Sequence, residues 1–87
     1  MSDFPSDSSL VWRDHPDSAS AVIDQPDGQM YMLSVSAPGE YTDVWTAQAE
    51  LLDADYRQVK FSGLYSGGDT REAAKAAALE ALRAIHG

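Results

Sequence analysis

The last part of the chain carries the clearest hydrophobic pattern. Between Arg71 and Ile85 there is no Gly, Pro or β-branched residue, and alanine, the best helix former, dominates. At about 100° per residue, the apolar side chains fall on one helix face: Ala74, Ala77, Ala78, Ala81, Leu82 and Ile85. The pattern predicts a helix over residues 71–86, with Asp69 and Glu72 capping its first turn. Because this face is mostly alanine, we expect the helix to lie close to a sheet that supplies larger side chains.

The segments before the helix alternate between apolar and polar residues, as half-buried strands do. Residues 29–37 place one set on the expected core face, Tyr31, Leu33, Val35 and Ala37, and Met30, Met32, Ser34 and Ser36 on the other. Residues 42–53 also alternate, with Trp45, Ala47, Ala49 and Leu51 opposite Val44, Thr46, Gln48, Glu50 and Leu52. Residues 19–24 and 56–65 are predicted as further strands, and Gly63 indicates a bulge in the second.

Residues that favour turns separate these segments at positions 14–17, 25–28, 38–40 and 53–55. The sequence therefore predicts one α+β domain over residues 10–87, an antiparallel meander of three to four strands with the C-terminal helix packed on one face. Residues 1–9 are polar and are expected to be a mobile segment. The apolar run at residues 10–12 predicts either an edge strand or a segment that packs Trp12 across the core.

The charge is strongly acidic and unevenly distributed. Asp and Glu number 14 against 6 Lys and Arg, a net charge of −8 over 87 residues. Residues 1–56 contain 11 of the acids and only one base, Arg13, so the predicted sheet is acidic and the predicted helix mildly basic. Such a charge disfavours binding to nucleic acid or anionic membranes and steers the domain towards a basic protein surface. Solubility alone is the other explanation of the same charge.

The sequence offers little chemistry for catalysis. There is no Cys, and the histidines, His15 and His86, lie near the two ends of the chain. Asp14, His15 and Asp17 stand close together, but a turn containing Pro favours a solvated loop over a metal site. We therefore expect no enzyme activity, no metal and no cofactor. No apolar run approaches the roughly 20 residues of a membrane span, so a cytoplasmic protein is expected.

The start of the predicted helix, Gly-Asp-Thr-Arg-Glu-Ala-Ala-Lys at residues 68–75, resembles two families. HicB-type antitoxins place a Gly-Asp-Thr-x-Glu-x-Ala opening on a helix after a three-stranded meander. Double-stranded-RNA-binding domains end in a Lys/Arg-Glu-Ala helix with an alanine-rich buried face. The first resemblance implies an antitoxin that neutralises a small basic ribonuclease. The second implies RNA binding, against which the acidic sheet argues, as does Ala74 in place of a lysine.

These observations favour a non-enzymatic protein-binding module. The sheet face opposite the helix is expected to present Met30, Met32, Val44 and Leu52 beside acids, and an apolar centre with a charged rim is typical of a protein interface. By size and charge the chain is similar to phage-encoded inhibitors, including anti-CRISPR proteins and other DNA mimics. The expected partner is a basic nucleic-acid-handling protein, and the chain itself is expected to be a monomer or a homodimer. An oligomerising structural domain is the remaining alternative. The candidate binding residues are Asp24, Asp27, Glu40, Asp43, Glu50, Asp53, Asp55, Met30 and Met32.

Overall fold

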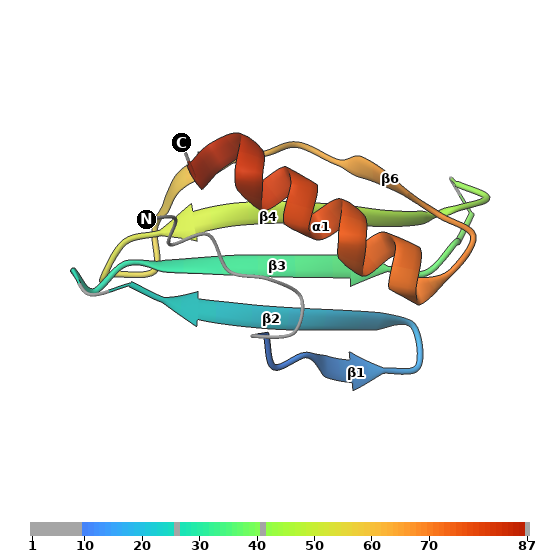
Figure 1. Cartoon of the computed structure of the whole chain (residues 1–87), viewed down its shortest axis with the longest axis horizontal. Helices are drawn as coiled ribbons and strands as arrows, with labels where there is room; N and C mark the ends of the chain where they lie inside the picture. Colours follow the sequence, from blue (N-terminus) through green and yellow to red (C-terminus); the bar gives the residue numbers. More distant parts are fainter. Residues whose placement is uncertain (1–9, 26, 41, 87) are drawn as a thin grey trace.

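The computed structural model describes residues 10–25, 27–40 and 42–86, and these form an antiparallel sheet followed by one helix (Figure 1). The elements are β1 (Arg13–His15), β2 (Ser18–Asp24), β3 (Met30–Ser36), β4 (Trp45–Leu52), β5 (Gln58–Phe61), β6 (Tyr65–Gly68) and α1 (Arg71–His86). The strands lie in the order β1-β2-β3-β4-β5, and β6 also pairs with β4. The predicted α+β meander with a helix on one face is confirmed. The predicted mobile segment, residues 1–9, lies outside the described residues, as does Pro26 of one predicted turn.

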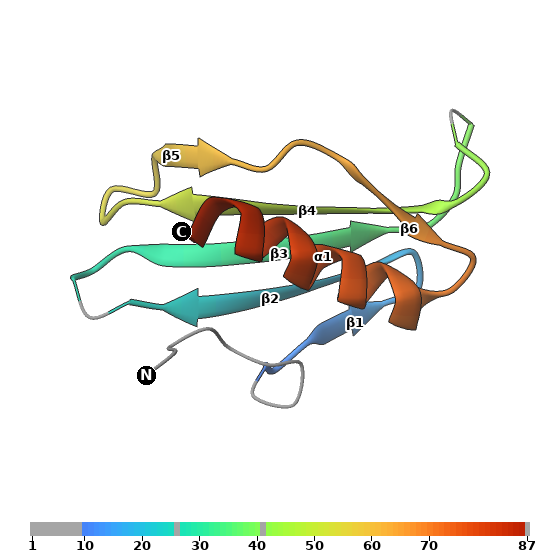
Figure 2. The ribbon, with the colours of Figure 1, turned by 45° about the horizontal axis from the view of Figure 1, so that its top comes forward.

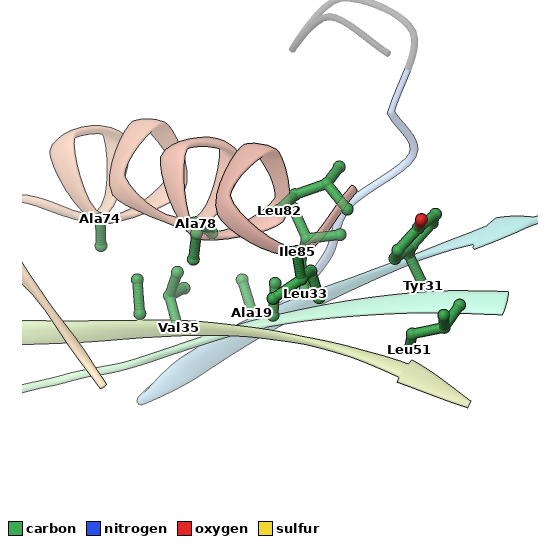
Figure 3. Close-up of a cluster of buried hydrophobic side chains, with 12 residues drawn as sticks. Ala19, Tyr31, Leu33, Val35, Leu51, Ala74, Ala78, Leu82 and Ile85 are labelled. Carbon is green, nitrogen blue, oxygen red and sulfur yellow. The ribbon is translucent and has the colours of Figure 1, made fainter. Parts of the chain in front are cut away.

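The core lies between one sheet face and α1. Both predicted core faces are confirmed, because the buried side chains alternate along β3 and β4 and follow the alanine face of the helix. Figure 3 shows Ala74 and Ala78 pointing from the helix towards the sheet, and Leu82 belongs to the same buried cluster as Leu33 and Val35. Each fully buried Leu or Val contributes about 1.5–3 kcal/mol. The small alanine side chains let the helix axis lie close to the strands, so the larger side chains of the sheet fill the space.

The predicted last strand, residues 56–65, contains only β5, and a further strand, β6, begins at its last residue. β5 and β6 both pair with β4, and the chain leaves the sheet between them, where Gly63 has a φ of +83°. At this break the Ser62 hydroxyl accepts a hydrogen bond from the Ala49 N–H at 3.0 Å. Gly67 belongs to β6 and not to a loop, and an added Cβ there would lie 2.7 Å from the Ala74 Cβ. The glycine is therefore what allows β6 to pass against the helix.

The helix cap also differs from the prediction. Thr70, not Asp69, caps α1, because the Ala73 N–H donates to the Thr70 hydroxyl at 3.1 Å. The Ala74 N–H donates to the Thr70 carbonyl at 3.0 Å, which closes the first helical turn. Gly68, with a φ of +79°, turns the chain from β6 into this cap, and only glycine adopts such a φ without strain.

The N-terminal part adds a strand that the sequence did not predict. Asp14 lies in β1, so the predicted turn at residues 14–17 is confined to Pro16 and Asp17. Trp12 packs against the core, which is the second of the two predicted alternatives, and the Lys75 ammonium lies 5.2 Å from the centre of its ring. The Asp14 carboxylate contacts Lys75 at 3.1 Å and Arg71 at 3.3 Å. These contacts join the N-terminal segment to the helix.

Candidate functional site

Two acidic turns lie side by side at one end of the sheet. Because the strands are antiparallel, the turn after β2 and the turn after β4 reach the same end, on the left in Figure 2. An added Cβ on Gly28 in the first turn would lie 3.6 Å from the Ala54 Cβ in the second. We call this end the acidic end, and it is formed by Asp24, Asp27, Asp53 and Asp55.

Two of these four aspartates hold the turns in shape. The Asp27 carboxylate accepts a hydrogen bond from the Gln29 N–H at 3.1 Å. The Asp53 carboxylate accepts from the N–H groups of Asp55 at 2.8 Å and Arg57 at 3.0 Å. Side-chain bonds of this kind, to the backbone two residues on, explain why aspartate stands at these turns.

The other two aspartates have no such task. Asp24 ends β2 and Asp55 lies in the second turn, and both are exposed. Neither carboxylate accepts a hydrogen bond from any residue that the structure describes. These two side chains are therefore available to a partner without loss of a turn contact.

We call the sheet face opposite α1 the open face. The half of this face that lies next to the acidic end is apolar. The strand register aligns two rows of side chains across it, Val22–Met32–Glu50–Phe61 and Asp24–Met30–Leu52–Gln58. Val22 is 48% and Phe61 47% exposed, so apolar surface reaches both sides of Glu50. The Glu50 carboxylate accepts a hydrogen bond from the Gln58 side-chain amide at 2.7 Å, which fixes its position among them.

One predicted member of this surface is not exposed. Leu52 is only 7% exposed, although it lies on the open face. It stands in its row between Met30 and Gln58, and a register shift at Leu51/Leu52 places an extra residue of β5 beside it. The prediction that Leu52 presents a binding surface is therefore wrong, and its neighbours form that surface.

The other half of the open face is polar. Two further rows, Ser20–Ser34–Gln48 and Ser18–Ser36–Thr46, carry hydroxyl and amide groups. The order Met-x-Met-x-Ser-x-Ser along β3 already contained this division, but only the register shows that the neighbouring strands repeat it. Val44, which the sequence assigned to the apolar surface, precedes β4 at the polar end.

The structure separates the predicted site residues into two groups. Seven of them lie at the acidic end and the apolar half of the open face: Asp24, Asp27, Glu50, Asp53, Asp55, Met30 and Met32. Glu40 and Asp43 instead lie in the connection between β3 and β4, at the opposite end of the sheet (Figure 1). The sequence grouped all nine by charge and pattern and did not show which of them share a surface.

The ion pairs lie away from the acidic end. Arg71 and Lys75 both contact Asp14, beside the start of the helix. The hydrogen bond from Lys75 lowers the pKa of Asp14, with Arg71 acting in the same direction. Two bases that made the helix appear mildly basic are thus engaged by an acid of β1, a pairing that charge counts along the chain do not reveal. The carboxylates of the acidic end have no such partner among the described residues.

The acidic end also acts on one core side chain. Tyr31 is buried, its ring centre lies 5.7 Å from that of His86, and its pKa is raised, first by burial and second by the charge of Asp27. A raised pKa means that the fold favours the neutral phenol. The resulting stability is complete below the unfolded pKa of about 10 and is lost as the pH rises through the folded pKa.

We therefore expect Tyr31→Phe to remove part of the stability loss at alkaline pH. The measurement is the urea midpoint of the parent chain and of Tyr31→Phe at pH 8 and at about pH 11, above the unfolded pKa of tyrosine. The variant should lose less stability than the parent between the two values. An equal loss in both would show that Tyr31 ionises as easily in the fold as in the unfolded chain.

Other chemical sites are not evident in the described ranges. No three acidic or histidine side chains there are grouped closely enough to hold a metal ion. The described helix is too short and too polar to cross a membrane. Comparison with family models, curated proteins and solved structures found no match to this chain. The resemblances to HicB-type antitoxins and RNA-binding domains therefore stay predictions.

Proposed function

We propose that this chain is a non-enzymatic protein-binding module that covers a basic surface of its partner. The observation that carries this proposal is the gathering of seven candidate residues at the acidic end and the apolar half of the open face. Four acids lie in or beside two adjacent turns there, with exposed Val22 and Phe61 near them. An apolar centre with a charged rim is the usual anatomy of a protein interface. The rim charges steer the approach, and the apolar groups provide buried area.

The charge of the surface defines the class of partner. The net charge of −8 repels nucleic acid, and a cluster of carboxylates attracts a protein that carries lysines and arginines. Proteins that handle nucleic acid have such surfaces because they neutralise phosphates. A module bound there competes with nucleic acid, so the proposed activity is inhibition of the DNA-mimic type. A small basic ribonuclease, the partner implied by the antitoxin resemblance, also carries a basic surface of this kind.

Two matched charge reversals test the proposal. Asp24→Lys/Asp55→Lys changes the acidic end without removing a turn contact, and Glu40→Lys/Asp43→Lys makes the same change in net charge at the opposite end. Each reversal removes an attraction and adds a repulsion, each of about 0.2–1 kcal/mol. The two reversals together therefore cost about 0.8–4 kcal/mol, so the first variant should bind its partner about fourfold to several hundredfold more weakly. The second should bind nearly as well as the parent chain.

The measurement is capture of partners from a lysate of the encoding organism, followed by binding assays on the captured protein at low and high salt. A basic nucleic-acid-handling protein that is lost at high salt, and lost with the acidic-end variant alone, supports the proposal. Equal losses with both variants would mean that the overall charge acts and not this surface. A dimer seen by light scattering would favour the oligomerising domain instead, if the contact between its two copies buries Met30 and Met32.

A further inference from the structure

The strand β2 is paired along only part of its outer edge. β1 begins at Arg13 and pairs only with Ser18, Ala19 and Ser20. Within the described residues no other strand lies along the remaining half of β2, residues 21–24. An exposed strand edge presents backbone groups that can pair with another chain. We call this half the free edge.

The ladder identifies which backbone groups point outwards there. The Ala37 N–H donates to the Asp17 carbonyl and the Gln25 N–H to the Gln29 carbonyl, both at 2.8 Å. Odd-numbered residues of β2 therefore bond to β3. Because the direction alternates in an antiparallel pair, the N–H and C=O groups of the even-numbered residues point away from β3.

Val22 and Asp24 are the even-numbered residues of the free edge. The Asp24 carbonyl accepts a long hydrogen bond of 3.4 Å from the Gln25 side chain, an exposed contact that an incoming N–H group can replace. The other outward groups, both groups of Val22 and the Asp24 N–H, have no partner among the described residues. The side chains of both residues lie on the open face, so an added strand meets them from the same side.

A hollow of about 550 Å³ lies against this edge. Its lining includes Val11, Val22 and Met32, with Arg13 and Asp24 adding opposite charges. Arg13 stands beside Ser20 and Asp24 four residues further along β2, so the charges mark the two ends of the hollow. The hollow is thus apolar in the middle, basic at Arg13, where β1 begins, and acidic at Asp24, where it meets the acidic end.

The chain itself turns away from this hollow. Trp12, the residue before β1, packs on the helix side of the sheet against the core, where Lys75 lies 5.2 Å from its ring. Val11 is 81% exposed beside the hollow and does not pair with β2. The packing of Trp12 against the core therefore explains why β1 begins only at Arg13 and why residues 10–12 do not cover the free edge.

We propose that the free edge binds an extended segment of the basic partner by strand addition. This inference rests on the proposed function, because that function supplies a partner of opposite charge. The segment has a lysine or arginine opposite Asp24 and, two residues along, an apolar side chain opposite Val22 that fills the hollow beside Met32. Backbone bonds give affinity in this mode, and alternate side chains give specificity. The motif is therefore basic-x-apolar in an extended conformation.

The opposite edge of the sheet is less suited to this role. Gly63 and the break between β5 and β6 interrupt it, so no continuous row of backbone groups is available. It also carries Lys60, which would repel a basic segment, as charged residues on edge strands commonly do for unwanted partners. The charge and the continuity of the two edges both favour β2.

The test uses the full chain and blocked six-residue peptides. One peptide carries Lys-Thr-Val in an otherwise Thr-rich sequence, and its control carries Glu-Thr-Val. We expect the lysine peptide to slow amide hydrogen exchange at Val22 and Asp24 at least about fivefold, because these N–H groups enter a ladder. The glutamate peptide should bind at least about tenfold more weakly. Slowed amide exchange around Phe61 in place of Val22 and Asp24, or no binding of either peptide, would overturn the inference.

Two variants separate this inference from the proposed function. Val22→Pro removes an outward N–H, which an edge strand tolerates because no bond to β3 is lost. A cooperative thermal unfolding transition is the check that this variant folds. It should no longer bind the lysine peptide, and it should capture the partner more weakly. Asp24→Lys, on an exposed side chain, tests the charge without any change of backbone. Partner capture that responds to Asp24→Lys/Asp55→Lys but not to Val22→Pro would overturn strand addition and leave the proposed function standing.

Hydrogen exchange at the same two amides also tests two other occupants of the free edge, a second copy of the chain and the N-terminal residues of the chain itself. Protection of Val22 and Asp24 that rises with protein concentration, without peptide, would show that a second copy pairs there. Protection in the free chain that disappears when residues 2–9 are deleted would show that the chain covers its own edge. Either result would overturn the assignment of this edge to a partner.

Discussion

Replacing Leu82 by alanine is expected to lower the free energy of unfolding by about 2–5 kcal/mol. Leu82 is fully buried on the helix face that meets the sheet, and Leu33 and Val35 are the other largest fully buried side chains of the same cluster (Figure 3). Its buried neighbours Ala78 and Ala81 on this face are too small to extend into the space that the substitution leaves. Urea unfolding followed by circular dichroism measures the loss.

Leu64→Ala is the matched control, since it removes the same atoms from a side chain that is 71% exposed. Its stability should stay within about 0.5 kcal/mol of the parent chain. If Leu82→Ala were as mild as Leu64→Ala, the helix would not pack on the sheet through this side chain. A small domain has a total stability of about 5–15 kcal/mol, so the core variant should show a visibly lower midpoint.

Replacing Gly67 by alanine is expected to destabilise the fold by about 1–3 kcal/mol. The added Cβ would lie 2.7 Å from the Ala74 Cβ, 2.9 Å from the Ala74 Cα and 3.0 Å from the Trp45 carbonyl oxygen. Two of these three atoms belong to the backbone, so relief requires β6 or α1 to move. Unfolding in urea measures the loss, and hydrogen exchange along β6 shows whether the strand separates from the helix.

Gly39→Ala is the control for this variant. Gly39 has no heavy atom within 4 Å of an added Cβ and does not have a positive φ. Alanine there should be neutral or should stabilise the fold by up to about 1 kcal/mol, because it reduces the freedom of the unfolded chain. A Gly67→Ala variant as stable as Gly39→Ala would mean that β6 and α1 lie further apart than the structure shows.

Local patterns determined the fold class and the core. A run of alanines with Leu82 and Ile85 at helical spacing specifies a helix with one buried face, and strict alternation over Tyr31, Leu33 and Val35 specifies a strand. Each of these patterns is formed by residues a few positions apart, so it does not depend on distant parts of the chain. The α+β meander followed from them.

Contacts between distant segments decided the rest of the fold. β1 exists because Arg71 and Lys75 bind Asp14, from which they are 57 and 61 residues away in the sequence, and because Trp12 packs against the core. The break at Gly63 depends on Ala49 of β4, whose N–H donates a hydrogen bond to the Ser62 hydroxyl. Within residues 56–65 the sequence indicated a bulge at Gly63, and only the pairing with β4 shows that β5 ends before it and that β6 begins after it.

The candidate site divides in the same way. The sequence by itself determined the acidity, the turn aspartates and the Met-to-Ser order along β3, since each is a property of neighbouring residues. Only the tertiary structure decided that Asp27 and Asp53 lie at one end, that Glu40 lies at the other, and that half of the outer edge of β2 is left unpaired by the described residues. The physical reason is that antiparallel pairing and register set which distant residues become neighbours, and a binding surface is made of such neighbours.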